Sequence, residues 1–192
     1  MTLARYIDAL TDFGHPVAKH LRPGLPSSVI SSFEEESGIQ LPQEIRELFR
    51  AFDGTEFLEG VLLGHGQIID GFHLMKVSEI SADKEIIDEV VEDFPFLAGE
   101  SHPFDSREML PIMADGLGNH IVVDVSERSE TFGSIGFFHH AGESTAEAFP
   151  SFQVLIEAHF EALKSGAYSL SDEGYIEAEF DKLEQVLTKH RK

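Results

Sequence analysis

The ten histidines of this chain are the residues whose chemistry first suggests a metal site. Their spacing argues against one, because no His-Glu-x-x-His sequence occurs and the adjacent His139 and His140 are expected to point to opposite faces of a strand. His159 falls near the apolar face of an expected helix, where we expect a buried, hydrogen-bonded histidine. A site assembled from distant residues, such as His120 or His139 with Asp124, stays open as an alternative.

Oxygen donors at Asp115, Asn119 and Asp124 form a grouping similar to a calcium loop. Their spacing lacks the alternate ligands and the distal bidentate glutamate of an EF-hand. Two glycines between Asp115 and Asn119 tolerate a positive φ angle, as does asparagine. We therefore expect the segment 115–119 to be a tight turn between two strands.

The sequence contains near matches to catalytic and nucleotide-binding motifs, but no complete one. Residues 142–146 read Gly-Glu-Ser-Thr-Ala, which lacks the final glycine of a nucleophile elbow, and Ser144 with Glu147 is better explained as a helix-capping box. The glycine spacing of the chain does not fit dinucleotide binding. The absence of cysteine excludes thiolate catalysis and cysteine-ligated metals. We therefore expect no cofactor, no metal site and no enzymatic activity.

The charge balance restricts the classes of partner. The 192 residues include 14 Lys and Arg against 35 Asp and Glu, which gives a net charge of −21. Such a chain repels phosphates, so we expect no nucleic-acid partner and no anionic membrane surface. No apolar run approaches the length of a membrane span, and Asp8 and Asp12 interrupt the place of a secretory signal. A cytoplasmic protein is the resulting expectation.

The helices and strands that position these residues can be predicted from the N-terminus onward. The first segment shows little periodicity in its apolar residues. Residues 1–26 contain His-Pro and Pro-Gly-Leu-Pro sequences and are expected to form an arm with one short helix. A helix capped by Ser27 or Ser28 should end at Gly38. Next, apolar residues at helical spacing predict a helix that starts at Pro42 and stops at Asp53-Gly54. These apolar residues are Ile45, Leu48, Phe49 and Phe52.

The middle of the chain changes to a strand pattern. Apolar runs at 57–63 and 68–75 suggest a hairpin or a pair of strands, and a helix with an acidic, solvated face should follow from Ser78 or Ser81 to Pro95. Three more strands are expected, at 110–114, 119–125 and 132–139.

Two helices should complete the chain, one from Pro150 to Gly166 and one from Ser171 to His190. Strands that do not alternate strictly with helices predict a single α+β domain, a mainly antiparallel sheet packed with helices. Its expected parts are an N-terminal arm (1–26), the α+β domain (27–166) and a C-terminal helical extension (167–192).

Two stretches of this sequence carry a family resemblance. Residues 36–42 read Glu-Ser-Gly-Ile-Gln-Leu-Pro and lead through the amphipathic helix to Asp53-Gly54, and residues 114–125 hold a glycine and Asn turn followed by a strand that ends near Asp124. Together these resemble the SUKH superfamily of Smi/Knr-type proteins, over about residues 27–163. Many members carry a tryptophan near the first strands, which this chain lacks, and Phe57 is its nearest substitute.

The resemblance implies an α+β binding protein. Many bacterial members are immunity proteins that neutralise toxins, often nucleases, and a fungal member is a regulatory scaffold in cell-wall synthesis. We therefore expect a non-catalytic protein-binding domain, whose partner is a protein such as a basic toxin domain attracted by the negative charge. Loop ends that flank the sheet are the expected partner-binding residues, because loops on a rigid scaffold commonly carry recognition. These residues are Asp53, Glu56, Asp70, Asp115, Asn119 and His139.

Two other functions stay open. In the first, the protein is a scaffold or docking module whose last helix mediates self-association or docking, although packing on its own domain is the expected role of that helix. In the second, dispersed carboxylates and histidines form an enzyme site. The oligomeric state does not follow from the sequence.

Overall fold

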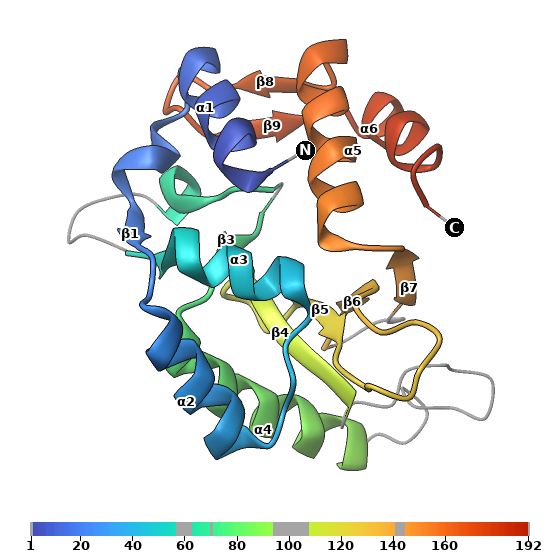
Figure 1. Cartoon of the computed structure of the whole chain (residues 1–192). Coiled ribbons are helices and arrows are strands. Elements are labelled where there is room, and N and C mark those ends of the chain that lie inside the picture. The colour runs from blue at the N-terminus through green and yellow to red at the C-terminus, as the bar shows by residue number, and fades with distance from the viewer. Residues whose placement is uncertain (1, 57–62, 70, 94–107, 141–144, 192) are drawn as a thin grey trace.

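A five-stranded antiparallel sheet forms the centre of the molecule (Figure 1). The computed structural model describes residues 2–56, 63–69, 71–93, 108–140 and 145–191. Strands adjacent in the chain are adjacent in the sheet, in the order β3-β4-β5-β6-β7. The five strands are β3 (His73–Leu74), β4 (Met109–Ala114), β5 (His120–Asp124), β6 (Ile135–Phe138) and β7 (Thr145–Phe149). The prediction of an α+β fold with a mainly antiparallel sheet is confirmed.

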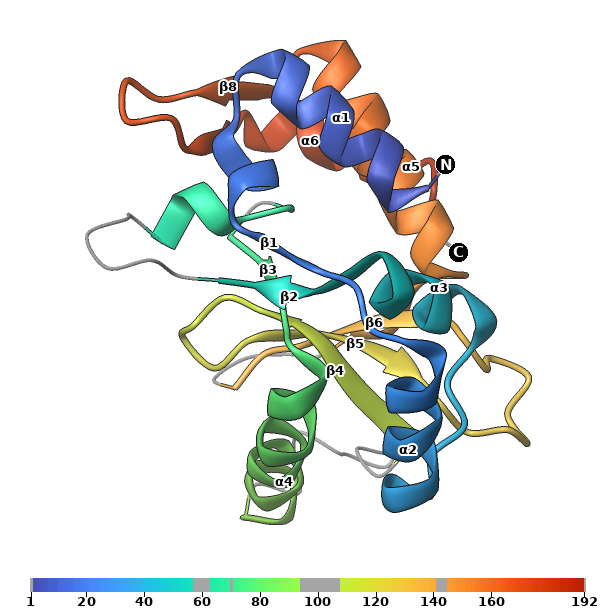
Figure 2. The same cartoon turned by 60° about the vertical axis from the view of Figure 1, so that its left-hand side comes forward.

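Both faces of this sheet are covered. Ile121 and Val123 of β5 face the main core, while Val122 between them joins a smaller cluster with Phe138 and Ile87. Ile87 belongs to α4 (Val77–Asp93), which lies below the sheet in Figure 2. Because each strand alternates its side chains, a strand that is apolar at consecutive positions must be covered on two sides.

The remaining helices and short strands lie along the other face and the edges of the sheet (Figures 1 and 2). The helices contribute much of the main core. They are α1 (Leu3–Phe13), α2 (Ser27–Ser37), α3 (Gln43–Ala51), α5 (Phe152–Ser165) and α6 (Phe180–Leu187), with 3-10 turns at Pro16–Lys19 and Leu63–Gly66. Two strand pairs accompany them, β1 (Leu21–Pro23) with β2 (Phe52–Thr55) and β8 (Tyr168–Leu170) with β9 (Ile176–Ala178).

The first 26 residues are part of the core and not a detached arm. Thr2 caps α1, and the helix ends at Gly14, which has a φ of 102°. Leu3, Tyr6 and Leu10 belong to the same buried cluster as the sheet residues, and α1 packs on α5. The sequence predicts an arm with one short helix, because the Pro and Gly residues that follow Phe13 obscure the amphipathic period of the helix before them.

The last predicted helix, from Ser171 to His190, is wrong in its first half. Residues 168–178 form the β8–β9 hairpin, whose turn contains Gly174 at a φ of 84°. Alternation of apolar residues in both strands suits a hairpin, and only α6 is helical. The apolar stripe of α6 is buried in its own domain, since Leu183, Val186 and Leu187 join the main core.

A second correction concerns the capping box predicted at Ser144 and Glu147. Residues 145–149 are strand β7, paired antiparallel with β6, and the helix that follows is capped by Ser151. Ser144 itself lies outside the described residues. The actual N-cap hydroxyl accepts a hydrogen bond from the Val154 N–H at 3.3 Å. For α2, the expected serine caps are replaced by Pro26, which makes no side-chain cap bond.

The Asp53-Gly54 pair fixes β2 against the start of α4. Asp53 Oδ1 accepts a hydrogen bond from the Val77 N–H at 3.2 Å, so it satisfies the first free donor of the helix. Gly54 has a φ of 82°, and a Cβ there would lie 2.7 Å from the Lys76 nitrogen. Only glycine allows this close backbone approach, which explains why Asp-Gly occupies this position in the sequence.

We predict that Gly54→Ala destabilises the fold by about 2–4 kcal/mol, because it combines left-handed backbone strain with a steric clash at Lys76. Gly116→Ala is the matched control, since Gly116 has a φ of 78° and an added Cβ would meet no atom within 4 Å. It should cost about 1 kcal/mol, the backbone strain alone. Urea unfolding of both variants measures the difference, and equal losses would contradict the proposed packing of β2 on residue 76.

Candidate functional site

The first turns of α4, strand β3 and the turn after β4 enclose a cleft of about 540 Å³. Its lining includes three carboxylates, from Glu79, Asp83 and Asp115, together with one cationic residue, Lys76, and the imidazole of His73. We call this cavity the acidic cleft. Thr55 of β2 also lines it, so the contact between β2 and α4 helps to shape the wall.

Asp115 is fixed by the turn that it begins. Its Oδ1 accepts from the Leu117 N–H at 2.7 Å and the Asn119 N–H at 3.1 Å, and its Oδ2 accepts from the Asn119 amide at 2.6 Å. Burial raises the pKa of Asp115, but these hydrogen bonds outweigh burial and hold the pKa below its usual value. The predicted tight turn is therefore present, and it holds an ionised carboxylate at the edge of the cleft.

Glu79 and Asp83 stand one helical turn apart on α4. Glu79 accepts from the Lys76 N–H at 3.3 Å and from the Lys76 ammonium at 2.8 Å, as the last member of a capping box does. Asp83 Oδ2 lies 3.0 Å from His120 Nε2. Half of the Glu79 side chain and a third of the Asp83 side chain stay exposed, so both carboxylates can reach a partner.

His73 adds a neutral group to the acidic cleft. Burial lowers the pKa of His73, and the carboxylates of Glu79, Asp115 and Asp83 oppose that effect without cancelling it. With a neutral imidazole, the charged groups are three carboxylates against one ammonium. The cleft is therefore a negative site built on rigid elements.

The structure brings some of the predicted partner-binding residues together. Asp115 and Asn119 share one turn, and Asn119 Oδ1 also accepts from the His140 N–H at 3.3 Å. Asp53 and Glu56 flank the Arg22 guanidinium at 3.6 Å each. These two residues lie next to the cleft, on either side of Gly54 and Thr55.

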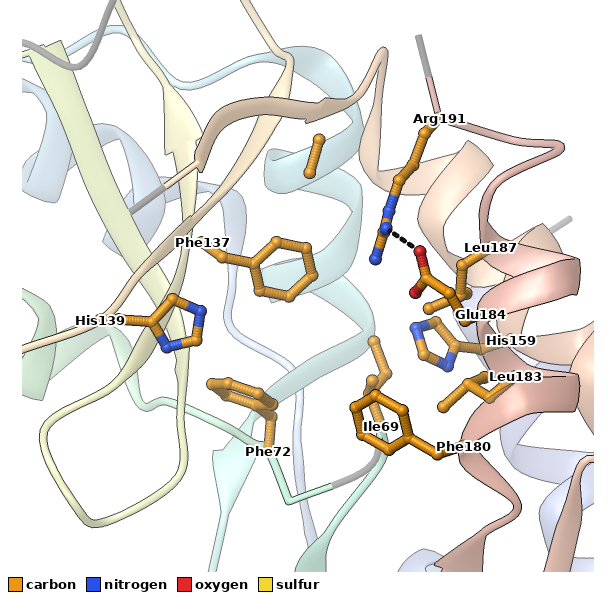
Figure 3. A pocket seen from close by; sticks show the side chains of 11 residues that line it. Ile69, Phe72, Phe137, His139, His159, Phe180, Leu183, Glu184, Leu187 and Arg191 are labelled. Atoms are coloured by element: carbon orange, nitrogen blue, oxygen red, sulfur yellow. Dashed lines mark hydrogen bonds and ion pairs between the residues drawn. The ribbon is translucent and has the colours of Figure 1, made fainter. Parts of the chain in front are cut away.

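One of the predicted residues falls elsewhere. His139 lines a different cavity, between the sheet and α6, where its ring stacks on Phe137 (Figure 3). Asp70 lies outside the described residues. The partner-binding role of all six residues stays a prediction.

Sequence reasoning missed Glu79, Asp83 and His73 as members of the site. The acidic residues of α4 were expected to form a solvated helix face, and residues such as Glu85 and Glu89 are indeed exposed. Position along the helix distinguishes the cleft carboxylates from the exposed ones. Glu79 and Asp83 are in the first two turns of α4, where the helix leaves the sheet.

The histidines singled out as metal candidates have other partners. His159 is buried and lies 2.5 Å from the Tyr168 hydroxyl through Nδ1, while His120 contacts Asp83. Asp124 accepts from the Ser126 N–H and the Thr131 hydroxyl. Within the described part of the chain, no group of three His, Asp or Glu side chains is arranged to hold a metal ion.

The model of the SMI1/KNR4 family (SUKH-1) matches residues 24–158. The chain belongs to the SMI1/KNR4 family. This family match spans more than half of the chain, contains every residue of the acidic cleft and confirms the predicted resemblance. Helix α1, the β8–β9 hairpin and α6 are additions outside the SMI1/KNR4 region, packed on α5.

A search of curated proteins found no match to this sequence. In the part of the chain that the structure describes, none of the helices has the length and apolar character to cross a membrane.

Two buried histidines predict a specific pH dependence of stability. Burial lowers the pKa of His159 to about 3 and that of His15 to about 4, from an ordinary value of 6.5. Both stay neutral in the folded protein, whereas the unfolded chain takes up protons below pH 6.5. The unfolded state then binds more protons, so the free energy of unfolding must fall as the pH drops.

We expect the free energy of unfolding to decrease between pH 7 and pH 5, with each histidine contributing a slope of up to about 1.4 kcal/mol per pH unit. His159→Asn removes one titrating group and should give a shallower slope. Urea unfolding at half-unit steps of pH measures both proteins. A wild-type stability that is flat or rises on acidification over this range would contradict the neutral, buried state.

Proposed function

We propose that this SMI1/KNR4 protein is a non-catalytic protein-binding domain that acts inside the cell as an immunity protein against a basic, nuclease-type toxin. The observation that carries the proposal is the acidic cleft, in which Glu79, Asp83 and Asp115 converge on about 540 Å³. The SMI1/KNR4 membership supports a binding domain, and the charge of the cleft and of the chain supports a basic toxin as its partner.

The negative charge of this protein favours both the encounter with a basic partner and the fit to it. A net charge of −21 attracts a positively charged protein from a distance and disfavours acidic competitors. At short range, carboxylates at a fixed spacing can accept paired hydrogen bonds from arginine side chains. A nuclease presents such cations where it binds phosphate, so the carboxylates of the cleft can occupy the place of its substrate.

The state of the cleft residues supports binding in preference to catalysis. Asp115 is ionised and engaged by three donors of its own turn, which makes it a poor general acid. Glu79 is engaged by Lys76, and Asp83 by His120. Such fixed carboxylates suit a complementary surface that a partner meets without rearrangement.

Co-expression with a basic toxin domain from a reading frame beside this gene tests the proposed function, which requires such a neighbouring toxin. The expected result is survival of cells that carry the toxin, together with recovery of a stable complex from those cells. A complex without protection would replace immunity by the scaffold function. Absence of any complex with purified components would refute the proposal.

Removing the negative charges of the cleft should weaken the complex more than an equal change in net charge elsewhere on the protein. We predict that the double variant Glu79→Gln, Asp83→Asn binds the toxin domain at least tenfold more weakly, about 1.4 kcal/mol or more. Both amides keep the local hydrogen-bond acceptors at Lys76 and His120, so the fold should persist.

The control is Glu127→Gln with Glu130→Gln, in the exposed loop between β5 and β6 at the opposite end of the sheet from the 115–119 turn. It changes the net charge by the same amount. Calorimetric titration should show a loss of less than about threefold for this control. Equal losses for the two double variants would assign the attraction to overall charge and would rule out the cleft as the binding site.

A further inference from the structure

A second cavity, which we call the apolar pocket, lies between α6 and the sheet and encloses about 400 Å³. Figure 3 shows the rings of Phe72, Phe137 and His139 on one side and the side chains of α6 on the other. The cavity is partly open to solvent, and most of its lining is aromatic or aliphatic. A cavity of about 150 Å³ already takes a benzene molecule, so this one has room for an aromatic side chain.

Phe180 stands at the rim of the apolar pocket with most of its side chain in solvent. It is 77% exposed, although Leu183 and Leu187, which follow it at helical spacing, are 6% and 7% exposed. The buried stripe of α6 therefore continues past the edge of its own domain. Single exposed apolar residues are common, but a ring beside an open, aromatic-lined cavity forms one continuous apolar surface.

The charge of this face suits a contact between two copies of the chain. Residues 180–192 include four Lys and Arg against two Asp and Glu, so they carry +2, and residues 1–179 carry −23. Two such chains repel each other over most of their surfaces, and this repulsion is weaker where α6 and the residues after it lie. A second copy can therefore approach the apolar pocket with less repulsion than it meets at the acidic cleft.

Two cations of this face are already paired within the chain. Arg191, which lines the apolar pocket, donates to Glu184 at 2.7 Å, and Lys182 forms an ion pair with Glu179 at the start of α6. Burying a cation without its carboxylate would be costly. An apolar contact at Phe180 can form without separating either pair.

A projecting ring and an open cavity on one face meet the requirement of a two-fold dimer. In such an interface the same patch of both subunits is in contact, so the patch has to be complementary to itself. Phe180 lies at the edge of the apolar pocket, so a two-fold axis near this residue can place each ring in the cavity of the other copy.

We propose that two copies of this chain associate through the α6 face, with Phe180 of each copy in the apolar pocket of the other. A phenyl ring suits the lining, because Phe72 and Phe137 offer aromatic contacts and the Arg191 guanidinium can lie over an aromatic face. The dimer is independent of the proposed immunity function, because it requires no toxin and the acidic cleft is lined by other side chains.

Sedimentation equilibrium of the purified full chain, over a range of concentrations, tests the association. The expected result is a mass that rises with concentration from 21.3 kDa towards twice that value. The mass of a single chain at every concentration up to about 1 mM, where even weak complexes form, would overturn the proposal.

Phe180→Asp removes the projecting ring, and Leu117→Asp is the matched control. Leu117 is 76% exposed and belongs to the 115–119 turn, so the control adds the same charge and removes a similarly exposed apolar side chain outside the apolar pocket. Phe180→Asp should weaken the association about tenfold or more, and Leu117→Asp should change it less than about threefold. Equal losses for the two variants would assign the association to another surface and overturn the proposal. Thermal unfolding at low protein concentration verifies that both variants fold.

Isotope-filtered NOE spectra of a sample that mixes labelled and unlabelled chains report contacts between copies without any substitution. The Phe180 ring of one copy should show NOEs to the Phe72 and Phe137 rings of the other copy. A dimer without these contacts would overturn the proposal even if Phe180→Asp does not fold. Because the chain is tested alone, such a result leaves toxin binding at the acidic cleft unaffected.

Discussion

The fold of the acidic cleft depends on the close crossing of β2 and the start of α4. Asp53 supplies the acceptor for the first N–H of the helix, and Gly54 removes the side chain that would separate the two backbones. This contact sets where Glu79 and Asp83 stand relative to Thr55 and the 115–119 turn. The Asp-Gly pair of the family pattern thus has a structural role: it holds β2 against α4 and thereby sets the geometry of the acidic cleft.

The contact between β2 and α4 concentrates part of the negative charge of the protein in the acidic cleft. Acidic residues are spread over much of the surface, and most of them contribute solubility. In the cleft, three carboxylates are held by a helix start and an Asp turn, so their spacing is fixed before a partner arrives. Preorganisation of this kind reduces the entropic cost of binding, and a general surface excess of carboxylates does not provide it.

The two cavities meet along one short segment. Ile69 and Phe72 line the apolar pocket, while Gly71 and His73 line the acidic cleft. Ile69 and Phe72 are joined by a backbone bridge, and Phe72 lines one cavity while its neighbours Gly71 and His73 line the other. A domain of this size therefore presents two chemically different concave sites on one framework.

Local patterns in the sequence were sufficient for much of the fold. Ile45, Leu48 and Phe49 of the predicted stripe are buried, and so are both flanks of the glycine turn at 115–119. Phe52, the last residue of that predicted stripe, is instead the first residue of β2, because the helix ends at Ala51. Contacts between distant segments were not accessible in this way. The packing of α1 in the core was not predicted because it depends on α5, and residues 171–178 were predicted to be helical because the acidic residues there resemble a helix start.

The candidate site was predicted less completely than the fold. Asp115 and Asn119 were found because turn chemistry is local. Glu79 and Asp83 were not, since only the tertiary crossing of β2 over α4 distinguishes them from the solvated acids on the same helix. His139 is predicted together with Asp115 and Asn119 from its position at a strand end, but it follows β6 directly and, like Phe137, lines the cavity between the sheet and α6.

Hydrogen exchange of the backbone amides in the presence of the basic toxin domain tests the central claim most directly, because it locates the partner without any substitution. The account predicts slower exchange at 73–83 and 114–119 in the complex, with the β8–β9 hairpin and the β5–β6 loop unchanged. Protection confined to the hairpin or to α6, with unaltered exchange around the cleft, would contradict it.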